Sequence, residues 1–503
     1  MSISGKLVSN TLFLFLDWFF VFVFSFLFWI IIWKNLPPLD VGIYSIVQNL
    51  IISIVTFTTL GFSAAWSKLI PEYLETKKLG MINSLIRFGS SLIFFVSLIM
   101  AVIIYFSGSI LVSILPNFPI EYVIFISIGV ILLSFEGVFG SILIGFQDMK
   151  KFFITDVVGN IVKFIVAFIL IILGFHSLGP IAGLILSFLI IFIFRLNLKW
   201  FKKTNMDINK KFVLYNYSLP ALISSFGPIV FSNMPYIILA FLSGLAATGI
   251  FTTAISVTSQ LTVLISILST AIFPVVSQLS VYRNSKSKQN AIINLGVKYG
   301  LLFTLPIALV LILAPRAIVL LLAQDKYLPA SNLFSILSVS FLIMGLSNIF
   351  LSSLYAVRRP KTNRNIWIFS SLFFLLLAIP LTIYYSAFGI SVAYLISVSI
   401  LFVLSIYYLR KYLKFKLNWI EISKMIGSSF IFVLFIFIAD SLSIPNIIKY
   451  LIGAVGFLSY FVSLIFMKFF TKNDVRVLEI LGDKIPFLKI IFTTLAKTIS
   501  KYT

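Results

Sequence analysis

Two neighbouring apolar runs contain four polar residues of kinds that such runs seldom carry. Glu136 lies in the first run, and Asp156, Asn160 and Lys163 lie in the second, beyond a short polar turn at 145–151. The spacing i, i+4, i+7 places the last three on one face of a helix. A charged side chain near the centre of a bilayer costs at least about 2.5–3.5 kcal/mol, so ionisable residues in membrane helices are functional candidates.

Glu136 and Lys163 are predicted to lie at matching depth. Each is about eleven residues from the polar turn along its own helix, which corresponds to about 16 Å at a rise of 1.5 Å per residue. Asp156 is closer to the turn and is expected near the membrane surface. Two interpretations follow: the polar side chains line a cavity, or Glu136 and Lys163 form an ion pair that stabilises the packing of the two helices.

The composition is that of a membrane protein with many spans. Of 503 residues, 60% are apolar and only 11% are charged, whereas a soluble protein carries roughly 25% charged residues. The net charge of +23 does not indicate nucleic-acid binding, because the basic residues form short clusters between long apolar runs. The absence of cysteine and the single histidine argue against a zinc or di-iron site, so no metal cofactor is expected.

The length of the apolar runs predicts how often the chain crosses the bilayer. Because about 20 apolar residues span a bilayer as a helix, we predict an all-α polytopic membrane protein with 14 transmembrane helices. The predicted spans are 10–33, 41–66, 84–107, 119–146, 152–174, 177–198, 214–243, 247–275, 297–322, 331–356, 365–386, 388–410, 422–440 and 446–470. With both termini in the cytosol, 33 of the 38 Lys and Arg residues lie on or near that side of the cytoplasmic membrane, as the positive-inside rule requires.

The two halves of the chain resemble each other. The segment 41–44 (VGIY) matches 248–251 (TGIF) at an offset of 207, and 178–183 matches 388–393 at an offset of 210. Two near-equal offsets predict parallel six-helix repeats about an axis along the membrane normal, with a substrate site between them. The predicted domains are an N-lobe at 1–210, a C-lobe at 211–412, two appended helices at 413–473 and a cytosolic amphipathic tail at 474–503.

Several short motifs together resemble a known transporter family. They are 39–45 (LDVGIYS) at the entry to the second span, 60–62 (LGF) and 71–73 (PEY) at its cytosolic end, the turn 145–149 (GFQDM) and the stretch 249–274. With 14 predicted spans, the chain resembles the polysaccharide and lipid-linked oligosaccharide flippases (Wzx-type) of the MOP superfamily. The resemblance covers nearly the whole chain. It implies two lobes around a central cavity and alternating access, by which an isoprenoid-pyrophosphate-linked glycan moves from the cytosolic to the outer leaflet.

The resemblance suggests roles for the polar residues of the first repeat. Lys163 would attract the pyrophosphate, with Glu136, Asn160 and Asp156 beside it in the cavity. Asp17, in the first span, would couple transport to a proton or sodium gradient, and such a cation is the one cofactor expected. The alternative for Asp17 is partial burial close enough to the membrane surface to stay hydrated.

Five further polar residues are assigned by position alone. Arg87, which opens the third span, and Lys68 before it would receive an anionic head group from the inner leaflet, or would only fix the topology. Asn49, Asn233 and Gln260 lie within spans, where they would hydrogen-bond sugars or join helices.

The seventh predicted span, 214–243, contains residues that interrupt a helix. Gly227, Pro228 and Pro235 break its backbone hydrogen-bond ladder. We predict a hinge here that gates a central cavity, and a static kink is the alternative.

Three other functions are weighed against the flippase. An ion-coupled multidrug extruder of the same superfamily usually has twelve spans. A peptidoglycan-precursor flippase is expected to carry arginines inside the early spans and the eighth, whereas spans one, two and eight of this chain contain none. A membrane glycan polymerase or ligase needs large outer loops, whereas the longest outer link, 323–330, is short. The sequence therefore favours a transporter without enzymatic activity, whose partners are a lipid-linked glycan, membrane lipids and other glycan-assembly proteins, and not nucleic acid.

Overall fold

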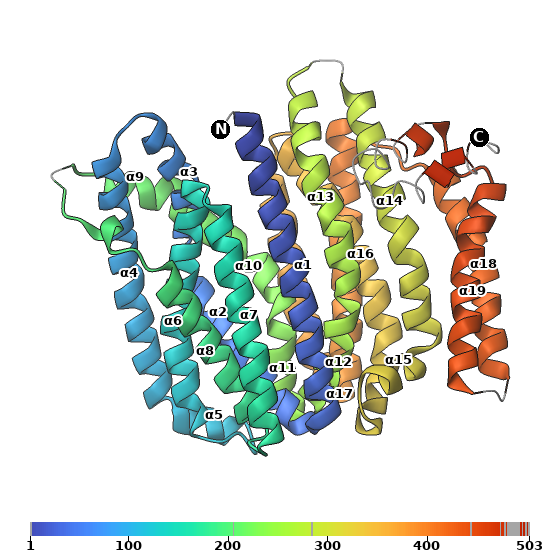
Figure 1. The fold of residues 1–503 in the computed structure, drawn as a ribbon, viewed down its shortest axis with the longest axis horizontal. Coiled ribbons are helices and arrows are strands. Elements are labelled where there is room, and N and C mark those ends of the chain that lie inside the picture. Colours follow the sequence, from blue (N-terminus) through green and yellow to red (C-terminus); the bar gives the residue numbers. More distant parts are fainter. Residues whose placement is uncertain are drawn as a thin grey trace. The chain divides into compact units, whose positions relative to one another are not determined.

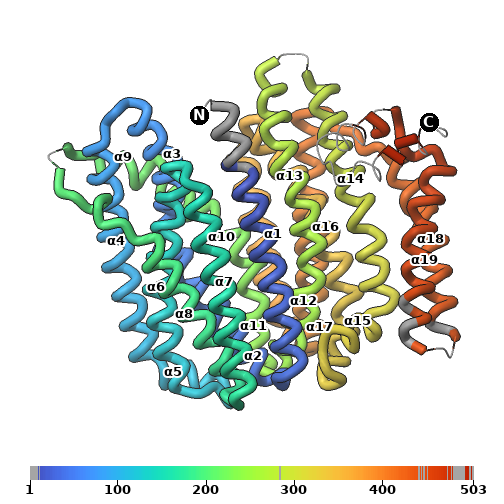
Figure 2. The backbone as a smooth tube through the Cα atoms, viewed as in Figure 1, coloured from blue at the N-terminus to red at the C-terminus, as the bar shows by residue number. Residues whose placement is uncertain are grey.

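A computed structural model describes residues 3–204, 206–282, 285–442, 445–472, 474–476, 479, 493–494, 496–497 and 500 (Figures 1 and 2). In these residues all regular secondary structure is helical, without a strand, which confirms the predicted all-α class. Most of the predicted amphipathic tail at 474–503 lies outside the described residues.

The helices follow one another in chain order as labelled in Figure 1. Most are α-helices, η1 and η3 are 3-10 helices, and η2 is one turn of π-helix. Their bounds are α1 Ile3–Asn35, α2 Pro38–Thr58, α3 Phe62–Glu75, α4 Leu79–Phe106, α5 Gly108–Ile114, α6 Tyr122–Phe146, α7 Met149–Ile172, α8 Leu178–Arg195, η1 Leu198–Phe201, α9 Lys210–Val213, η2 Leu214–Ser218, α10 Leu219–Ser232, α11 Met234–Ser243, α12 Leu245–Thr258, α13 Gln260–Leu279, α14 Lys286–Leu313, α15 Pro315–Leu322, η3 Asp325–Ala330, α16 Ser331–Ala356, α17 Pro360–Leu413, α18 Trp419–Ser441 and α19 Asn446–Phe466.

Many of these helices are long and apolar enough to cross a membrane. Within the described residues there are 11 such helices, or up to 12 if the bent pair Lys210–Ser232 and Met234–Ser243 counts as one span. This confirms a multi-pass membrane protein. One predicted span ends early: α2 stops at Thr58 rather than at 66, because Leu60 and Gly61 take positive φ angles of 50° and 72° that no α-helix contains.

The helix α17 covers two of the predicted spans. Its 54 residues would extend about 80 Å if the helix were straight, far more than a bilayer core requires. Ser386 interrupts it with φ 51° and ψ −131°. A Cβ on Gly389 would lie 1.9 Å from the carbonyl oxygen of Leu381, whereas a straight helix separates residues eight apart by about 12 Å. The chain therefore reverses at Ser386, between the predicted spans 365–386 and 388–410.

The chain packs as two compact units. Unit 1 comprises Met1–Ile255, Val319–Leu333 and Trp367–Ser397, and unit 2 comprises Ser256–Ile318, Phe334–Ile366 and Val398–Thr503. Within unit 1, α3 and α9 lie at one end and α5 at the opposite end (Figure 1). The lobes at 1–210 and 211–412 follow from the sequence repeats and stay a prediction.

Unit 2 buries a network of charged side chains. The ammonium of Lys298 on α14, which is only 2% exposed, lies 2.6 Å from a carboxylate oxygen of Asp474 and 3.6 Å from one of Glu421 on α18. The Tyr299 hydroxyl also donates to Asp474. Burial alone would raise the pKa of Asp474, but hydrogen bonds from Lys298 and Tyr299 outweigh it and hold the pKa below its usual value. The network joins α14 to the segment that follows α19. Within unit 2, α18 and α19 lie side by side (Figure 2).

In unit 1, residues that the sequence repeat makes equivalent contact each other. A Cβ on Gly42 would lie 1.8 Å from the carbonyl oxygen of Leu245, and a Cβ on Gly249 would lie 1.8 Å from that of Pro38. The hydroxyl groups of Ser45 and Thr252, which are also 207 residues apart, are joined by a hydrogen bond of 2.9 Å. Equivalent residues of two parallel repeats meet only near the axis that relates them, so this contact agrees with the predicted duplication.

The contact predicts the effect of one added methyl group. Gly42→Ala places a Cβ inside the van der Waals radius of a backbone carbonyl that cannot rotate away, and overpacking of this kind costs about 1–3 kcal/mol. We expect a lower midpoint of thermal unfolding for the purified protein in detergent. Gly137→Ala is the matched control, since no atom of the described chain lies within 4 Å of its Cβ position. Equal midpoints for the two variants would contradict the close approach.

Candidate functional site

Four helices of unit 1 bring five ionisable side chains within electrostatic reach of one another. They are Asp17 on α1, Glu136 on α6, Asp156 and Lys163 on α7, and Arg195 on α8. We call this set the buried charged cluster. Its four members predicted from the sequence are thus placed together, and Arg195 joins them as a fifth.

Arg195 holds the buried charged cluster together. It is 2% exposed, and its guanidinium forms an ion pair with Asp156. Its Nε donates to the Thr155 hydroxyl at 2.9 Å, and one terminal nitrogen donates to the carbonyl oxygen of Glu136 at 3.3 Å. The guanidinium carbon also lies 4.6 Å from the centroid of the Phe152 ring. Arg195 therefore joins α8 to both α6 and α7.

Arg195 lies near the end of the predicted span 177–198, and nothing in the sequence indicated a role for it. It is the last residue of α8, where an arginine can either extend toward water or fold back along its helix. Two features of the fold direct it inward: Asp156 supplies a carboxylate, and Gly140 leaves the space. A Cβ on Gly140 would lie 2.7 Å from a guanidinium nitrogen. Asp156, expected at the membrane surface, has a side chain that is only 18% exposed.

Lys163 and Glu136 do not form the direct ion pair of the second interpretation. Among the described residues, no carboxylate lies within 4.0 Å of the Lys163 ammonium. That ammonium instead lies 4.4 Å from the centroid of the Phe28 ring on α1, a cation–π contact, and it interacts with the Glu136 carboxylate only at longer range. One carboxylate oxygen of Glu136 is buried and has no hydrogen-bond partner in the described chain.

Asp17 reaches the cluster because α1 packs along α7. The centroid of the Phe153 ring lies 6.0 Å from the ring centroids of Phe13 and Phe20. These two residues of α1 are one helical turn before and one turn after Asp17. One carboxylate oxygen of Asp17 is buried and has no hydrogen-bond partner in the described chain. The cluster therefore contains three carboxylates and two cations, an excess of one negative charge when all are ionised.

The predicted neutral residues differ in how their amides are used. Asn49, Asn160 and Gln260 each donate to the carbonyl oxygen four residues earlier in the same helix, at 2.8, 2.9 and 3.2 Å. Asn160 is on α7 beside the cluster, whereas Gln260 belongs to unit 2. The amide nitrogen of Asn233 is buried without a partner in the described chain.

The predicted hinge residues fall into two places. The bend of 48° lies at Asn233, between α10 and α11, and Pro235 is in the first turn of α11. Gly227 and Pro228 lie inside α10. A Cβ on Gly227 would lie 2.6 Å from the Cβ of Trp367, so this glycine serves a close helix–helix contact. Pro235 is therefore the predicted residue that stands at the bend.

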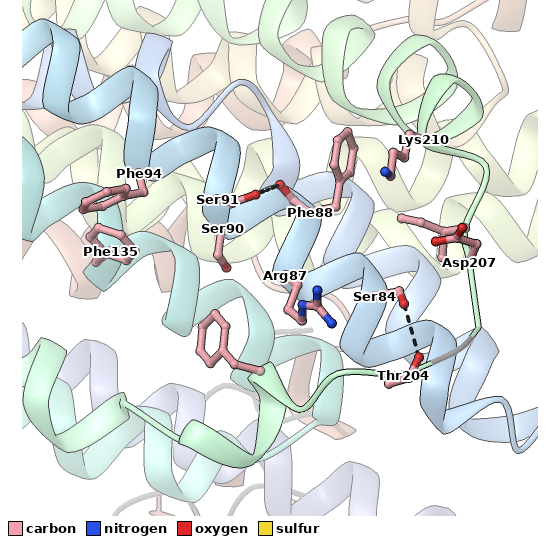
Figure 3. Close-up of a pocket in the computed structure, with 12 residues that line it drawn as sticks. Ser84, Arg87, Phe88, Ser90, Ser91, Phe94, Phe135, Thr204, Asp207 and Lys210 are labelled. Atoms are coloured by element: carbon pink, nitrogen blue, oxygen red, sulfur yellow. Dashed lines mark hydrogen bonds between the residues drawn. The ribbon is translucent and has the colours of Figure 1, made fainter.

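The two predicted head-group residues are separate. Arg87 lines a cavity of about 580 Å³ at the start of α4 (Figure 3). Lys68, on α3, instead lies 3.9 Å from Glu72, and both side chains are more than half exposed. Lys68 is therefore a surface residue, whereas Arg87 lines a pocket.

The buried ion pair predicts that Arg195→Gln lowers the stability of the protein much more than Lys68→Gln does. Arg195→Gln leaves Asp156 charged and uncompensated, which costs about 3–5 kcal/mol for a buried pair. Lys68→Gln breaks an exposed pair worth about 0–1 kcal/mol. Thermal unfolding in detergent should therefore separate the two variants, and Arg195→Gln with Asp156→Asn should recover part of the loss. Similar midpoints for the two single variants would contradict this account.

Comparison with known proteins identifies the family of the chain. Residues 7–280, more than half of the chain, match the sequence profile of the family described as "Polysaccharide biosynthesis protein". An uncharacterized membrane protein of Methanocaldococcus jannaschii is 23% identical over 499 residues, which cover 95% of this chain and 98% of that protein.

Two solved structures share the fold. The lipid II flippase MurJ, in an inward closed conformation, has a TM-score of 0.69 at 18% identity, with 91% of this chain and 98% of that chain covered. A multidrug resistance MATE family transporter of the MOP superfamily, in an inward-facing conformation, has a TM-score of 0.66 at 15% identity, with 78% and 94% covered. The chain therefore belongs to the polysaccharide biosynthesis protein family and has the fold of the MOP-superfamily transporters, as its motifs predicted.

Proposed function

We propose that the protein is a flippase that moves an isoprenoid-(pyro)phosphate-linked oligosaccharide from the cytosolic to the outer leaflet of the cytoplasmic membrane. Membership of the polysaccharide biosynthesis family and the fold shared with a lipid II flippase support this class of substrate. The lobes predicted at 1–210 and 211–412 would alternate access to the substrate between the two sides. Other glycan-assembly proteins would supply and use it.

The proposed topology has 14 spans and both termini in the cytosol. Counting α10 and α11 as one bent span, α17 as two spans and α19 as one raises the 11 long helices to this number. An even number returns the chain to its starting side. The basic links support a cytosolic start.

The position of the Lys163 ammonium over the Phe28 ring is the main support for this function. An ammonium within a membrane helix, over an aromatic ring and without a carboxylate within 4.0 Å in the described chain, keeps a positive charge for a ligand. A phosphate group is the part of the proposed substrate that such a charge attracts. Arg195, by contrast, is already neutralised by Asp156.

The excess carboxylate of the buried charged cluster suggests how transport is driven. Asp17 and Glu136 each bury a carboxylate oxygen that has no hydrogen-bond partner in the described chain, which is costly when the group is charged. A bound proton removes that charge. We infer that a proton binds to this excess carboxylate and is released during the cycle.

The role of Lys163 is tested by transport in cells. Lys163→Ala should abolish complementation of a strain that lacks its own flippase, because the phosphate loses its cation. Lys150→Ala is the matched control, since Lys150 is an exposed lysine at the start of the same helix. Full export by Lys163→Ala, at normal membrane levels, would remove Lys163 from the substrate site. Drug resistance without glycan export would instead favour an ion-coupled multidrug extruder, whose fold the chain also shares.

The role of Asp17 is tested in vesicles. Transport by the unmodified protein should rise with an imposed pH gradient and be insensitive to sodium. Asp17→Asn mimics a permanently protonated carboxylate, so transport should lose its response to the pH gradient while substrate binding is kept. A retained pH response in Asp17→Asn would assign coupling to another residue, and a sodium response in the unmodified protein would overturn the proton proposal.

A further inference from the structure

A pocket at one end of unit 1 combines cations, hydroxyl groups and aromatic rings. Its volume is about 580 Å³, within the range of small-molecule sites. One wall is the first half of α4, and the other is the segment that leads from η1 to α9 (Figure 3). None of its residues belongs to the buried charged cluster, so its function is not explained by that cluster.

The charges of the pocket favour an anion. Arg87 and Lys210 enter it from opposite walls, and Asp207 is the one carboxylate among the lining residues (Figure 3). In the described chain, no carboxylate lies within 4.0 Å of the Arg87 guanidinium or the Lys210 ammonium. Lys210 lies 5.7 Å from the centroid of the Phe88 ring. The pocket therefore carries a net positive charge that the described chain leaves unpaired.

Ser90 shows that the pocket is suited to a polar ligand. It is 3% exposed, lines the pocket, and its hydroxyl has no hydrogen-bond partner in the described chain. A buried hydroxyl without a partner costs free energy that a ligand oxygen would recover. Ser91, by contrast, already donates to the carbonyl oxygen of Phe88 at 3.0 Å.

Hydrogen bonds hold the wall opposite α4 at Thr204 and at Asn209. The Thr204 hydroxyl donates to the carbonyl oxygen of Gly80 at 3.1 Å and lies 3.4 Å from the Ser84 hydroxyl. The Asn209 side chain accepts from the backbone N–H of Phe212 at 3.0 Å and so caps the helix that begins at Lys210. These hydrogen bonds hold the backbone on either side of the pocket, from which Arg87 and Lys210 extend.

The pocket borders exposed apolar side chains of α4. Phe94 lines it and is 42% exposed, and the next residue, Phe95, is 60% exposed. From there α4 presents apolar side chains along its outer face as far as Phe106. A ligand with a charged head in the pocket could lay a hydrocarbon chain on this surface.

From this arrangement we propose that the pocket binds the phosphate head group of an anionic lipid. Arg87 and Lys210 hold the phosphate oxygens, the Ser90 hydroxyl donates to the same group, and the apolar chain follows α4 from Phe94. Two kinds of lipid offer this phosphate chemistry, a membrane phospholipid and an isoprenoid diphosphate. The pocket shares no residue with the buried charged cluster, so loss of lipid binding here and loss of transport at Lys163 can be told apart.

Native mass spectrometry of the full chain in a neutral detergent tests the proposal. The probes are phosphatidylglycerol, an isoprenoid diphosphate, phosphatidylcholine and inorganic phosphate. We expect an anionic lipid to bind. Arg87→Gln or Lys210→Gln should lower the affinity for that lipid by about tenfold or more, as loss of a charge-assisted hydrogen bond predicts. Lys211→Gln is the matched control, since Lys211 carries the same charge one residue further along and does not line the pocket.

The four probes separate the possible outcomes. Preference for the isoprenoid diphosphate would support the pocket as a binding site for a carrier lipid, and preference for phosphatidylglycerol would support a resident membrane lipid. Equal weakening by Arg87→Gln and Lys211→Gln would indicate attraction to a basic surface and would overturn the site. So would binding of inorganic phosphate or phosphatidylcholine as strong as that of the anionic lipids. Unchanged thermal unfolding of the variants excludes a loss of fold.

Discussion

The charge of Arg195 is the constraint on which the interior of unit 1 depends. A guanidinium stays protonated in proteins, so its burial requires a carboxylate, and Asp156 supplies one. This pair fixes α7 against α8. Lys163 lies seven residues further along α7, about 10 Å away, where it meets Phe28 rather than Glu136. Asp156 thus pairs with Arg195 and not with Lys163.

The fold was largely predictable because hydrophobic length and basic links report directly on membrane insertion. The predicted span at 331–356 coincides with α16. The offset of 207 predicted a duplication but not the contact that the structure shows between Gly42 and Gly249. The errors arose where the backbone leaves the helix without a change in hydropathy. The positive φ of Leu60 ends α2 inside an apolar run, and only the backbone shows it.

The site was predictable in part, for a different reason. Helical spacing correctly placed Asp156 near Asn160 and Lys163 on α7, and it brought Glu136 to the neighbouring helix. It gave no signal for Arg195, since an arginine at a helix end has the same sequence context whether it extends into water or folds back. The direction was decided by tertiary features, the space at Gly140 and the carboxylate of Asp156, which are far apart in sequence.

The charged network of unit 2 has a consequence for biosynthesis. Lys298 is separated from Asp474 by 176 residues, and at about 5–20 residues per second the ribosome needs roughly 10–35 s to make that interval. Glu421 emerges earlier and is the more distant partner, at 3.6 Å. During synthesis the Lys298 ammonium therefore lies in a membrane helix before the Asp474 carboxylate, its closer counter-ion, has been made. The segment at Asp474, which is made after α18 and α19, completes the packing of α14, so a chain truncated before Asp474 would leave the Lys298 ammonium without its closer counter-ion.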